Sequence, residues 1–253
     1  VADMVYAEYL KAKSLDDTGT LLFGWPSLDN MTGGLRGGDV CSIVGRPASG
    51  KTMQMLYVAH NHWKNGGAPL VLSMEMTNMM IAQRLAAMNT HIPLTHILKG
   101  ELSSKNTENM MARLEINKQH DNPFWLVDGN LTATVDDLIM LCRQLHPTAV
   151  FIDGAYLLRH PNPRATRWDR LTENAEWIKQ KLATDLSLPV VCSYQFNREV
   201  SKRKKKDGDK AGLEDIYGTD AIAQLSSVVL GLFEHESVET EKRRRIDVIK
   251  GRN

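Results

Sequence analysis

The chain has 253 residues, of which 42% are hydrophobic and 24% are charged, and its formal net charge at pH 7 is +1. This length and composition are typical of one large globular domain, and the small net charge excludes a protein that is basic over its whole surface. No apolar run approaches the ~20 residues that a membrane-spanning helix needs, and the first residues lack the charged-then-apolar layout of a signal peptide.

Cysteines and histidines show no pattern of a metal site. Cys41, Cys142 and Cys192 are too few and too scattered for a disulfide framework or a zinc site. Each lies in an apolar stretch, which favours buried thiols in a reducing compartment. His60 and His62 are two residues apart on an expected helix and therefore point in different directions. We expect solvated or hydrogen-bonded histidines.

The first predicted element is a short amphipathic helix over residues 2–13, with Val5, Tyr9 and Leu10 on one side. It has no obvious place in a central sheet, so we interpret residues 1–20 as a short N-terminal linker helix with its connection. Residues 21–253 are interpreted as one domain.

A phosphate-binding loop follows the first predicted strand. Residues 40–44 form a short apolar run with β-branched members, which predicts a buried strand, and residues 53–59 favour a helix. Between them, residues 45–52 read GRPASGKT, a complete G-x-x-x-x-G-K-[ST] pattern. In this position backbone N–H groups and the helix dipole can hold phosphates. The alternative is a glycine-rich turn that binds nothing, and the flanking strand and helix argue against it.

Four residues of the pattern have expected tasks. Gly45 and Gly50 let the backbone wrap closely around phosphates, Lys51 would reach the β and γ phosphates, and the Thr52 hydroxyl would bind Mg²⁺. The pattern therefore predicts an NTPase. The candidate nucleotide-binding residues are Gly45, Arg46, Pro47, Ala48, Ser49, Gly50, Lys51 and Thr52.

Downstream, apolar strand-like runs alternate with helical segments. The predicted strands cover residues 70–74, 124–127, 149–152, 190–193 and 228–232, and residues 246–249 alternate like a further strand. Helices are predicted for residues 78–88 with Thr77 as the N-cap, for a segment that Thr134 opens in a capping-box-like start, and for residues 168–186. The alternation predicts an α/β fold with a mainly parallel central sheet and helices on both faces. Ligands then bind at the carboxyl ends of the strands.

Polar side chains follow three of these strands. Glu75 stands between two methionines, Asp153 follows an apolar run, and Gln195 comes just after residues 190–193. An aspartate in this place is expected for a carboxylate that orders Mg²⁺, so Thr52 and Asp153 are the candidate metal residues. One polar residue at a strand end is ordinary. Three of them in a chain with a complete phosphate loop favour a catalytic site.

Several segments, in the same order, resemble one family. From about residue 24 to residue 253 the sequence is similar to the ATPase domain of DnaB-type replicative helicases, which share a RecA-like core with bacteriophage primase-helicases. Besides the phosphate loop, the resemblance rests on GWPSLD (24–29), TGGLRGGD (32–39), SMEM (73–76), FID (151–153), QFNR (195–198) and IYGTDAIAQ (216–224). It implies a RecA-like P-loop NTPase core that works with ATP and Mg²⁺.

The resemblance also implies roles for single residues. Glu75 would polarise the attacking water, and Gln195 would sense the γ-phosphate. Lys250 and Arg252 match a lysine and an arginine that reach the neighbouring subunit's nucleotide, and strand alternation places both on one face. Taken alone, a basic strand end exposed to solvent is the simpler interpretation. The candidate catalytic residues are Glu75, Lys51, Gln195, Arg252 and Lys250.

Contacts with single-stranded DNA are expected in two segments. The basic run at 201–210 is too charged to pack, so we expect a mobile loop whose lysines touch phosphates or only water. Residues 216–224 resemble the family's DNA-contact segment, although Tyr217 stands where an arginine is usual and Asp220 where a second glycine is common. Backbone N–H groups there could grip phosphates, and Tyr217 could stack on a base. The candidate DNA-binding residues are Lys204, Lys205, Lys206, Tyr217, Gly218 and Thr219.

The favoured interpretation is a hexameric, ATP-driven 5′→3′ DNA helicase core in the cytoplasm of a bacterium, or of a phage's host, with a primase and a helicase loader as partners. The ring and the polarity are implied by the resemblance alone. A RecA-like ATPase with a regulatory or recombination role is the first alternative, and the QFNR and 221–224 segments are closer to helicases. A P-loop kinase would need a lid and a substrate pocket, which the sequence does not suggest. We expect the chain to be part of a longer protein.

Overall fold

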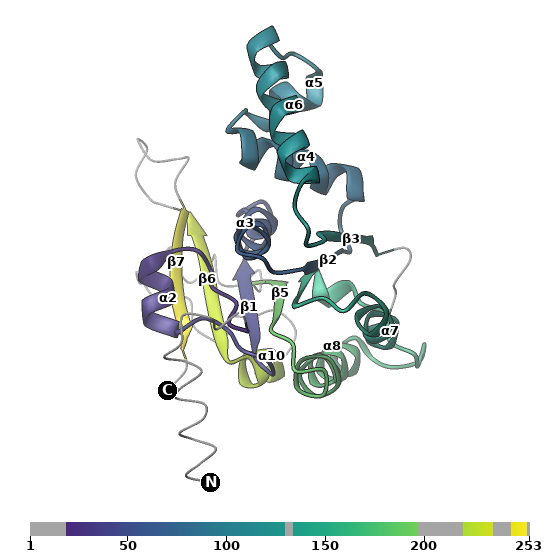
Figure 1. The fold of residues 1–253 in the computed structure, drawn as a ribbon. Helices are drawn as coiled ribbons and strands as arrows, with labels where there is room; N and C mark the ends of the chain where they lie inside the picture. The colour runs from purple at the N-terminus through teal and green to yellow at the C-terminus, as the bar shows by residue number, and fades with distance from the viewer. Residues whose placement is uncertain (1–18, 130–133, 197–219, 235–243, 252–253) are drawn as a thin grey trace, which may run out of the picture.

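The protein is described by a computed structural model that covers residues 19–129, 134–196, 220–234 and 244–251 (Figure 1). Three sets of predictions fall outside these residues and stay predictions: the helix at 2–13, the DNA-binding candidates and Arg252. The DNA-binding candidates concerned are Lys204, Lys205, Lys206, Tyr217, Gly218 and Thr219.

Within the described residues, the strands form one seven-stranded sheet. They are β1 (Val40–Gly45), β2 (Pro69–Ser73), β3 (Trp125–Asp128), β4 (Ala149–Asp153), β5 (Val190–Gln195), β6 (Val228–Glu234) and β7 (Arg244–Lys250). Their order across the sheet is β3-β2-β4-β5-β1-β6-β7, and every neighbouring pair is parallel except β6 with β7. The predicted mainly parallel sheet is confirmed, and each predicted strand is present with ends that differ by at most two residues.

Helices cover both faces of the sheet (Figure 1). The first face carries α2 (Pro26–Thr32), α3 (Lys51–Lys64) and α4 (Asn78–Thr90), and the second carries α7 (Val135–Leu145), η1 (Ala155–Leu157), α8 (Arg167–Trp177), η2 (Ile178–Thr184) and α10 (Asp220–Leu225). On β4, Val150 and Ile152 pack into the core below α7 and α8, whereas Phe151 packs into the core below α3. This alternation is the pleat of a strand that is buried on both faces.

The predicted helix starts are confirmed by hydrogen bonds. The Thr77 hydroxyl accepts the backbone N–H of Met80 at the start of α4. Thr134 and Asp137 form a capping box at the start of α7. The helix predicted for residues 168–186 runs from 167 to 184, but its second half, η2, is a π-helix and not an α-helix.

Two of the helices that the sequence did not predict, α5 (Leu94–Lys99) and α6 (Ser104–Lys118), contact α4 and extend away from the sheet (Figure 1). Neither helix buries a residue. The apolar residues Met111, Leu114 and Ile116 of α6 are exposed. A stripe of apolar residues facing a core is the signal by which a helix is found in a sequence, and these helices lack it.

The cysteines and the paired histidines have structural environments. Cys41, Cys142 and Cys192 are free and buried, as predicted, and burial raises the pKa of Cys142 and of Cys192 to about 12. His60 Nε2 lies 3.0 Å from Asn89 Oδ1, and His62 Nε2 lies 2.7 Å from Thr148 Oγ1. None of the helices in the described ranges is long and apolar enough to cross a membrane.

Candidate nucleotide-binding site

Strand register brings the predicted site residues to one edge of the sheet. Gly45 of β1 is level with Gln195 of β5, and Ser73 of β2 is level with Asp153 of β4. Because these four strands are parallel, both pairs lie at their carboxyl ends. Glu75 follows β2 by two residues. The phosphate loop and the three polar residues therefore meet where an α/β sheet binds its ligands.

The phosphate loop is a tight turn between β1 and α3. Ala48 and Gly50 have φ values of 62° and 98°, in the left-handed region. At Gly45 a Cβ atom would lie 2.5 Å from Ser49 Oγ, so a larger residue would displace the Ser49 side chain. Gly50 caps α3 without a side-chain hydrogen bond, which leaves the first N–H groups of this long helix to a ligand.

Two loop residues suit a phosphate. The Lys51 side chain is largely buried, and its Nζ donates to the backbone oxygen of Arg46 at 2.9 Å. Burial lowers the pKa of Lys51, and the carboxylates of Glu75 and Asp153 oppose this effect. Ser49 Oγ is buried and has no hydrogen-bond partner among the described residues. A buried cation and a free donor favour an anionic ligand in the loop.

Asp153 is held by hydroxyl groups on both sides. Its Oδ2 accepts from Thr52 Oγ1 and its Oδ1 from Ser193 Oγ, both at 2.8 Å. Asp153 is 1% exposed, and this burial raises the pKa of its carboxyl, whereas the two hydroxyl groups lower it. Ser193 Oγ also accepts the N–H of Gly154 at 2.8 Å.

The Thr52–Asp153 pair fits Mg²⁺, because this ion takes oxygen ligands and commonly keeps only one or two from protein, with water and phosphate oxygens completing its shell. Among the described residues no cluster of three or more histidine, cysteine or acidic side chains could hold a metal ion.

Glu75 and Gln195 are joined by a residue that the sequence did not single out. The hydroxyl of Tyr156 donates to Glu75 Oε1, and Gln195 Nε2 donates to the same hydroxyl at 2.5 Å. Burial, followed by the neighbouring Glu75, raises the pKa of Tyr156. Tyr156 lies on η1, directly after β4. The sequence offered one signal for this role, a tyrosine three residues after the aspartate at the strand end, but a core tyrosine would give the same signal.

A family model described as the DnaB-like helicase C terminal domain matches residues 21–253. The chain belongs to this family. It is 28% identical to the replicative DNA helicase DnaB of Treponema pallidum over 247 residues, which cover 95% of this chain and 54% of the relative. It is 27% identical to a probable plasmid replicative DNA helicase of Chlamydia psittaci, covering 97% of this chain and 54% of the relative. The chain thus spans about half the length of these relatives.

Solved structures show the same fold. One solved ATPase domain superimposes with a TM-score of 0.84 at 21% identity, and the match covers 100% of this chain and 91% of that one. A DnaB-like replicative helicase, solved in a study of its interactions with primase, superimposes with a TM-score of 0.83 at 21% identity, covering 100% of this chain and 62% of that one. The predicted RecA-like core is therefore confirmed.

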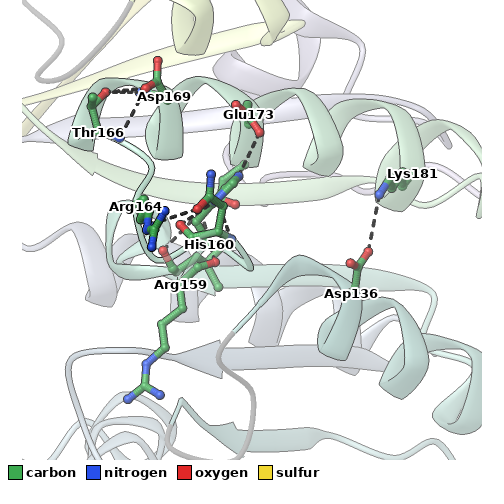
Figure 2. A network of polar contacts seen from close by, with 11 residues as sticks. Asp136, Arg159, His160, Arg164, Thr166, Asp169, Glu173 and Lys181 are labelled. Carbon is green, nitrogen blue, oxygen red and sulfur yellow. Dashed lines mark hydrogen bonds and ion pairs between the residues drawn. The ribbon is translucent and has the colours of Figure 1, made fainter.

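Arg159 is a second site residue of this DnaB-like domain that the sequence did not indicate. It lines a cavity of about 300 Å³ together with Glu75 and Asp128. Figure 2 shows that Arg159 points away from a polar network around His160. His160 Nε2 lies 2.8 Å from Glu173 Oε2, and its ring stacks on Trp177. This network holds the segment between η1 and α8, which begins two residues after Tyr156.

Lys250 lies at the opposite end of the strands of the DnaB-like sheet, near the amino-terminal ends of the parallel strands. In the antiparallel pair of β6 and β7 it is level with Val229, near the start of β6, whereas Gly45 is level with Leu232. Its Nζ donates to the backbone oxygens of Ala223 and Gln224 in α10 at 2.9 and 3.0 Å. Burial lowers the pKa of Lys250. The predicted catalytic residues Lys51, Glu75 and Gln195 are thus brought together, and Lys250 is not among them.

The start of β7, in contrast, lies beside the phosphate loop. Arg244 Nε donates to the backbone oxygen of Ser49 at 3.2 Å. This arginine, like Tyr156 and Arg159, was missed in the sequence, where it appears as one member of a basic run.

Proposed function

We propose that the chain is the motor domain of a replicative DNA helicase that hydrolyses ATP, moves on single-stranded DNA and unwinds duplex 5′→3′ as a hexameric ring. One observation carries the proposal: the phosphate loop, the Thr52–Asp153 pair and Glu75 meet at the carboxyl edge of the sheet. This arrangement occurs in a chain that belongs to the DnaB-like helicase family.

Each residue at this edge has a task in ATP hydrolysis. The N–H groups of residues 45–52 and the Lys51 ammonium hold the phosphates, which replace the Arg46 oxygen as partners of Lys51. Thr52 and Asp153 would hold Mg²⁺, which would supply charge neutralisation at the phosphates when bound. Glu75 orients and polarises the attacking water, and Gln195 contacts the γ-phosphate.

Lys250 and Arg252 act from the neighbouring subunit. Lys250 lies at the edge of the sheet opposite the phosphate loop of its own chain, which argues against a role at its own nucleotide. In a closed ring with head-to-tail contacts, one surface of each subunit meets a different surface of the next. A cation supplied across such an interface stabilises the charge that develops during phosphoryl transfer.

Single-stranded DNA is the proposed polymer substrate, bound by Lys204–Lys206 and by the segment from Tyr217 to Thr219. A DnaB-like relative of known structure was solved with regard to its interactions with primase, which supports a primase as a partner of this protein too. A helicase loader is a further expected partner. The bacterial relatives support a cytoplasmic location, in a bacterium or in the host of a phage.

The second candidate is a RecA-like ATPase that regulates or recombines DNA without unwinding it. It would use the same phosphate loop, Asp153 and Glu75. The relatives that the chain matches along most of its length are replicative helicases, which favours the motor.

Substitutions at Lys51 and Glu75 test the nucleotide site. Lys51→Ala should weaken ATP binding, because it removes the buried cation of the loop. Glu75→Gln should bind ATP as the wild type does and lose turnover, because the amide cannot polarise water. Equilibrium binding of a fluorescent ATP analogue and a phosphate-release assay separate the two effects. A Glu75→Gln variant that hydrolyses ATP at the normal rate would show that the catalytic assignment is wrong.

A further inference from the structure

The hydroxyl group of Tyr156 stands between the two residues to which we assign water activation and phosphate sensing. It donates its proton to Glu75 Oε1 and accepts the Nε2 N–H of Gln195. A tyrosine hydroxyl has one proton, and the Tyr156 hydroxyl donates it to Glu75. The direction of both hydrogen bonds is therefore fixed.

This direction also fixes the side-chain amide of Gln195. Because the Tyr156 proton is already given to Glu75, only the NH₂ group of Gln195 can satisfy the remaining lone pair. The amide oxygen of Gln195 must then point away from Tyr156. When Gln195 moves, the Tyr156 hydroxyl loses or gains a hydrogen-bond donor, and its hydrogen bond to Glu75 changes as a result.

The segment that carries Tyr156 holds it in this place. Gly154, with φ 83°, turns the chain directly after Asp153 into η1. Its N–H is bonded to Ser193 Oγ, which also holds Asp153. A Cβ atom on Gly154 would lie 3.2 Å from Glu75 Cγ, so the Glu75 side chain packs against this turn. Tyr156 is thus held in place by the turn that follows Asp153, the candidate metal residue, and by its hydrogen bond to Glu75.

We propose that Tyr156 is a positioning residue that couples Gln195 to Glu75, an inference that rests on the proposed ATPase function. Glu75 is an exposed side chain, and without a partner its carboxylate would sample several rotamers. The hydrogen bond from Tyr156 holds one carboxylate oxygen and leaves the other to orient water. Because Gln195 donates to the same hydroxyl, a γ-phosphate that binds Gln195 alters the hydrogen bond by which Tyr156 positions Glu75.

Tyr156→Phe is the test, since it removes the hydroxyl and keeps the ring. We expect kcat for ATP hydrolysis to fall about 10- to 100-fold, the range for losing a hydrogen bond to a charged group. KM for ATP and the affinity for a non-hydrolysable ATP analogue should stay within about twofold, because Tyr156 touches neither the loop nor Thr52 in the proposed site. A purely structural residue would not separate kcat from KM in this way.

Tyr57→Phe is the matched control. The Tyr57 hydroxyl donates to the backbone oxygen of Gly24 at 3.1 Å, outside the site, and its ring stacks on Trp25. The control should keep wild-type kcat, and its melting temperature should match that of Tyr156→Phe. A Tyr156→Phe variant with the kcat of the control, or one that melts well below the control and loses analogue binding, would overturn the proposal.

A double variant shows whether Tyr156 acts through Glu75. In the Glu75→Gln background, adding Tyr156→Phe should leave the residual rate unchanged within about twofold, because the carboxylate that Tyr156 positions is gone. An equal loss in both backgrounds would mean that Tyr156 acts independently, and the proposal would be wrong. Normal turnover by Glu75→Gln alone would instead refute the proposed function, so the two failures can be distinguished.

Discussion

The strand register leads us to predict that each nucleotide site is completed by the neighbouring subunit. Gly45 is level with Leu232 of β6, and Lys250 is level with Val229. Three residues along a strand correspond to about 10 Å, and the two strand spacings from β1 to β7 add about 10 Å sideways. The backbone of Lys250 is therefore about 14 Å from the phosphate loop of its own chain, whereas a lysine side chain spans roughly 6 Å. Its own nucleotide is out of reach.

The perturbation is a pair of inactive variants, Lys51→Ala and the double variant Lys250→Ala/Arg252→Ala. The double variant should bind ATP, assemble and hydrolyse it at least about a hundredfold more slowly, since a cation supplied in trans is worth ~10³–10⁵ in rate. In an equal mixture of the two variants, about a quarter of the interfaces of a randomly assembled ring join an intact Lys51 to an intact Lys250 and Arg252. ATPase activity should return to about a quarter of the wild-type rate if the interfaces act independently.

The assay is steady-state phosphate release from the mixture and from each variant alone, with energy transfer between labelled subunits to demonstrate exchange. A mixture that stays inactive despite exchange would mean that the cations act on their own subunit's nucleotide. A double variant that is nearly fully active by itself would mean that Lys250 and Arg252 contribute nothing to hydrolysis in the neighbouring subunit. Either result would refute the reasoning from register.

Two further predictions concern acidity and salt. Burial lowers the pKa of His62 to about 4. In the unfolded chain this histidine titrates near 6.5, so the unfolded chain takes up the proton first as the pH falls. The free energy of unfolding should therefore drop by about 2 kcal/mol between pH 7 and pH 5. Urea titrations should show this loss in the wild type and less of it in His62→Gln; equal losses would contradict the assignment. Replacing Lys204, Lys205 and Lys206 with alanine should reduce the salt slope of single-stranded DNA binding by about 2, at ~0.7 per phosphate contact. The same change at the exposed Lys105 and Lys118 should leave the slope unaltered, and an unchanged slope in the triple variant would move DNA contact to the segment from Tyr217 to Thr219.

The sheet could be predicted because its strands are buried on both faces. Such strands appear as short continuous apolar runs, as in residues 149–152, and each was found within two residues of its ends. The helix starts at Thr77 and Thr134 were predictable because N-capping depends on neighbouring residues only. The meeting of Glu75, Asp153 and Gln195 followed from parallel strands, whose carboxyl ends share one edge.

Features that depend on tertiary geometry could not be predicted. The link through Tyr156 requires the left-handed turn at Gly154 and the 3₁₀ turn after it. The sequence does not reveal these turns, so in the sequence Tyr156 looks the same as a tyrosine of the core. Alternation along β7 indicated a shared face for alternate residues, but only the antiparallel pairing with β6 places Lys250 at the edge away from the phosphate loop. The helices α5 and α6 bury no residue, so they lack the apolar stripe that marks a packed helix.

Unwinding of a forked duplex with a 5′ single-stranded tail tests the central claim most directly. The wild-type chain, assembled on the fork, should separate the strands when ATP is added, and a fork with only a 3′ tail should stay intact. Glu75→Gln should bind the same fork and the ATP analogue and separate no strands, because the motor lacks the group that activates water. ATP hydrolysis by the wild type without strand separation on either fork, or unwinding by Glu75→Gln at the wild-type rate, would contradict the account of this chain as an ATP-driven helicase motor.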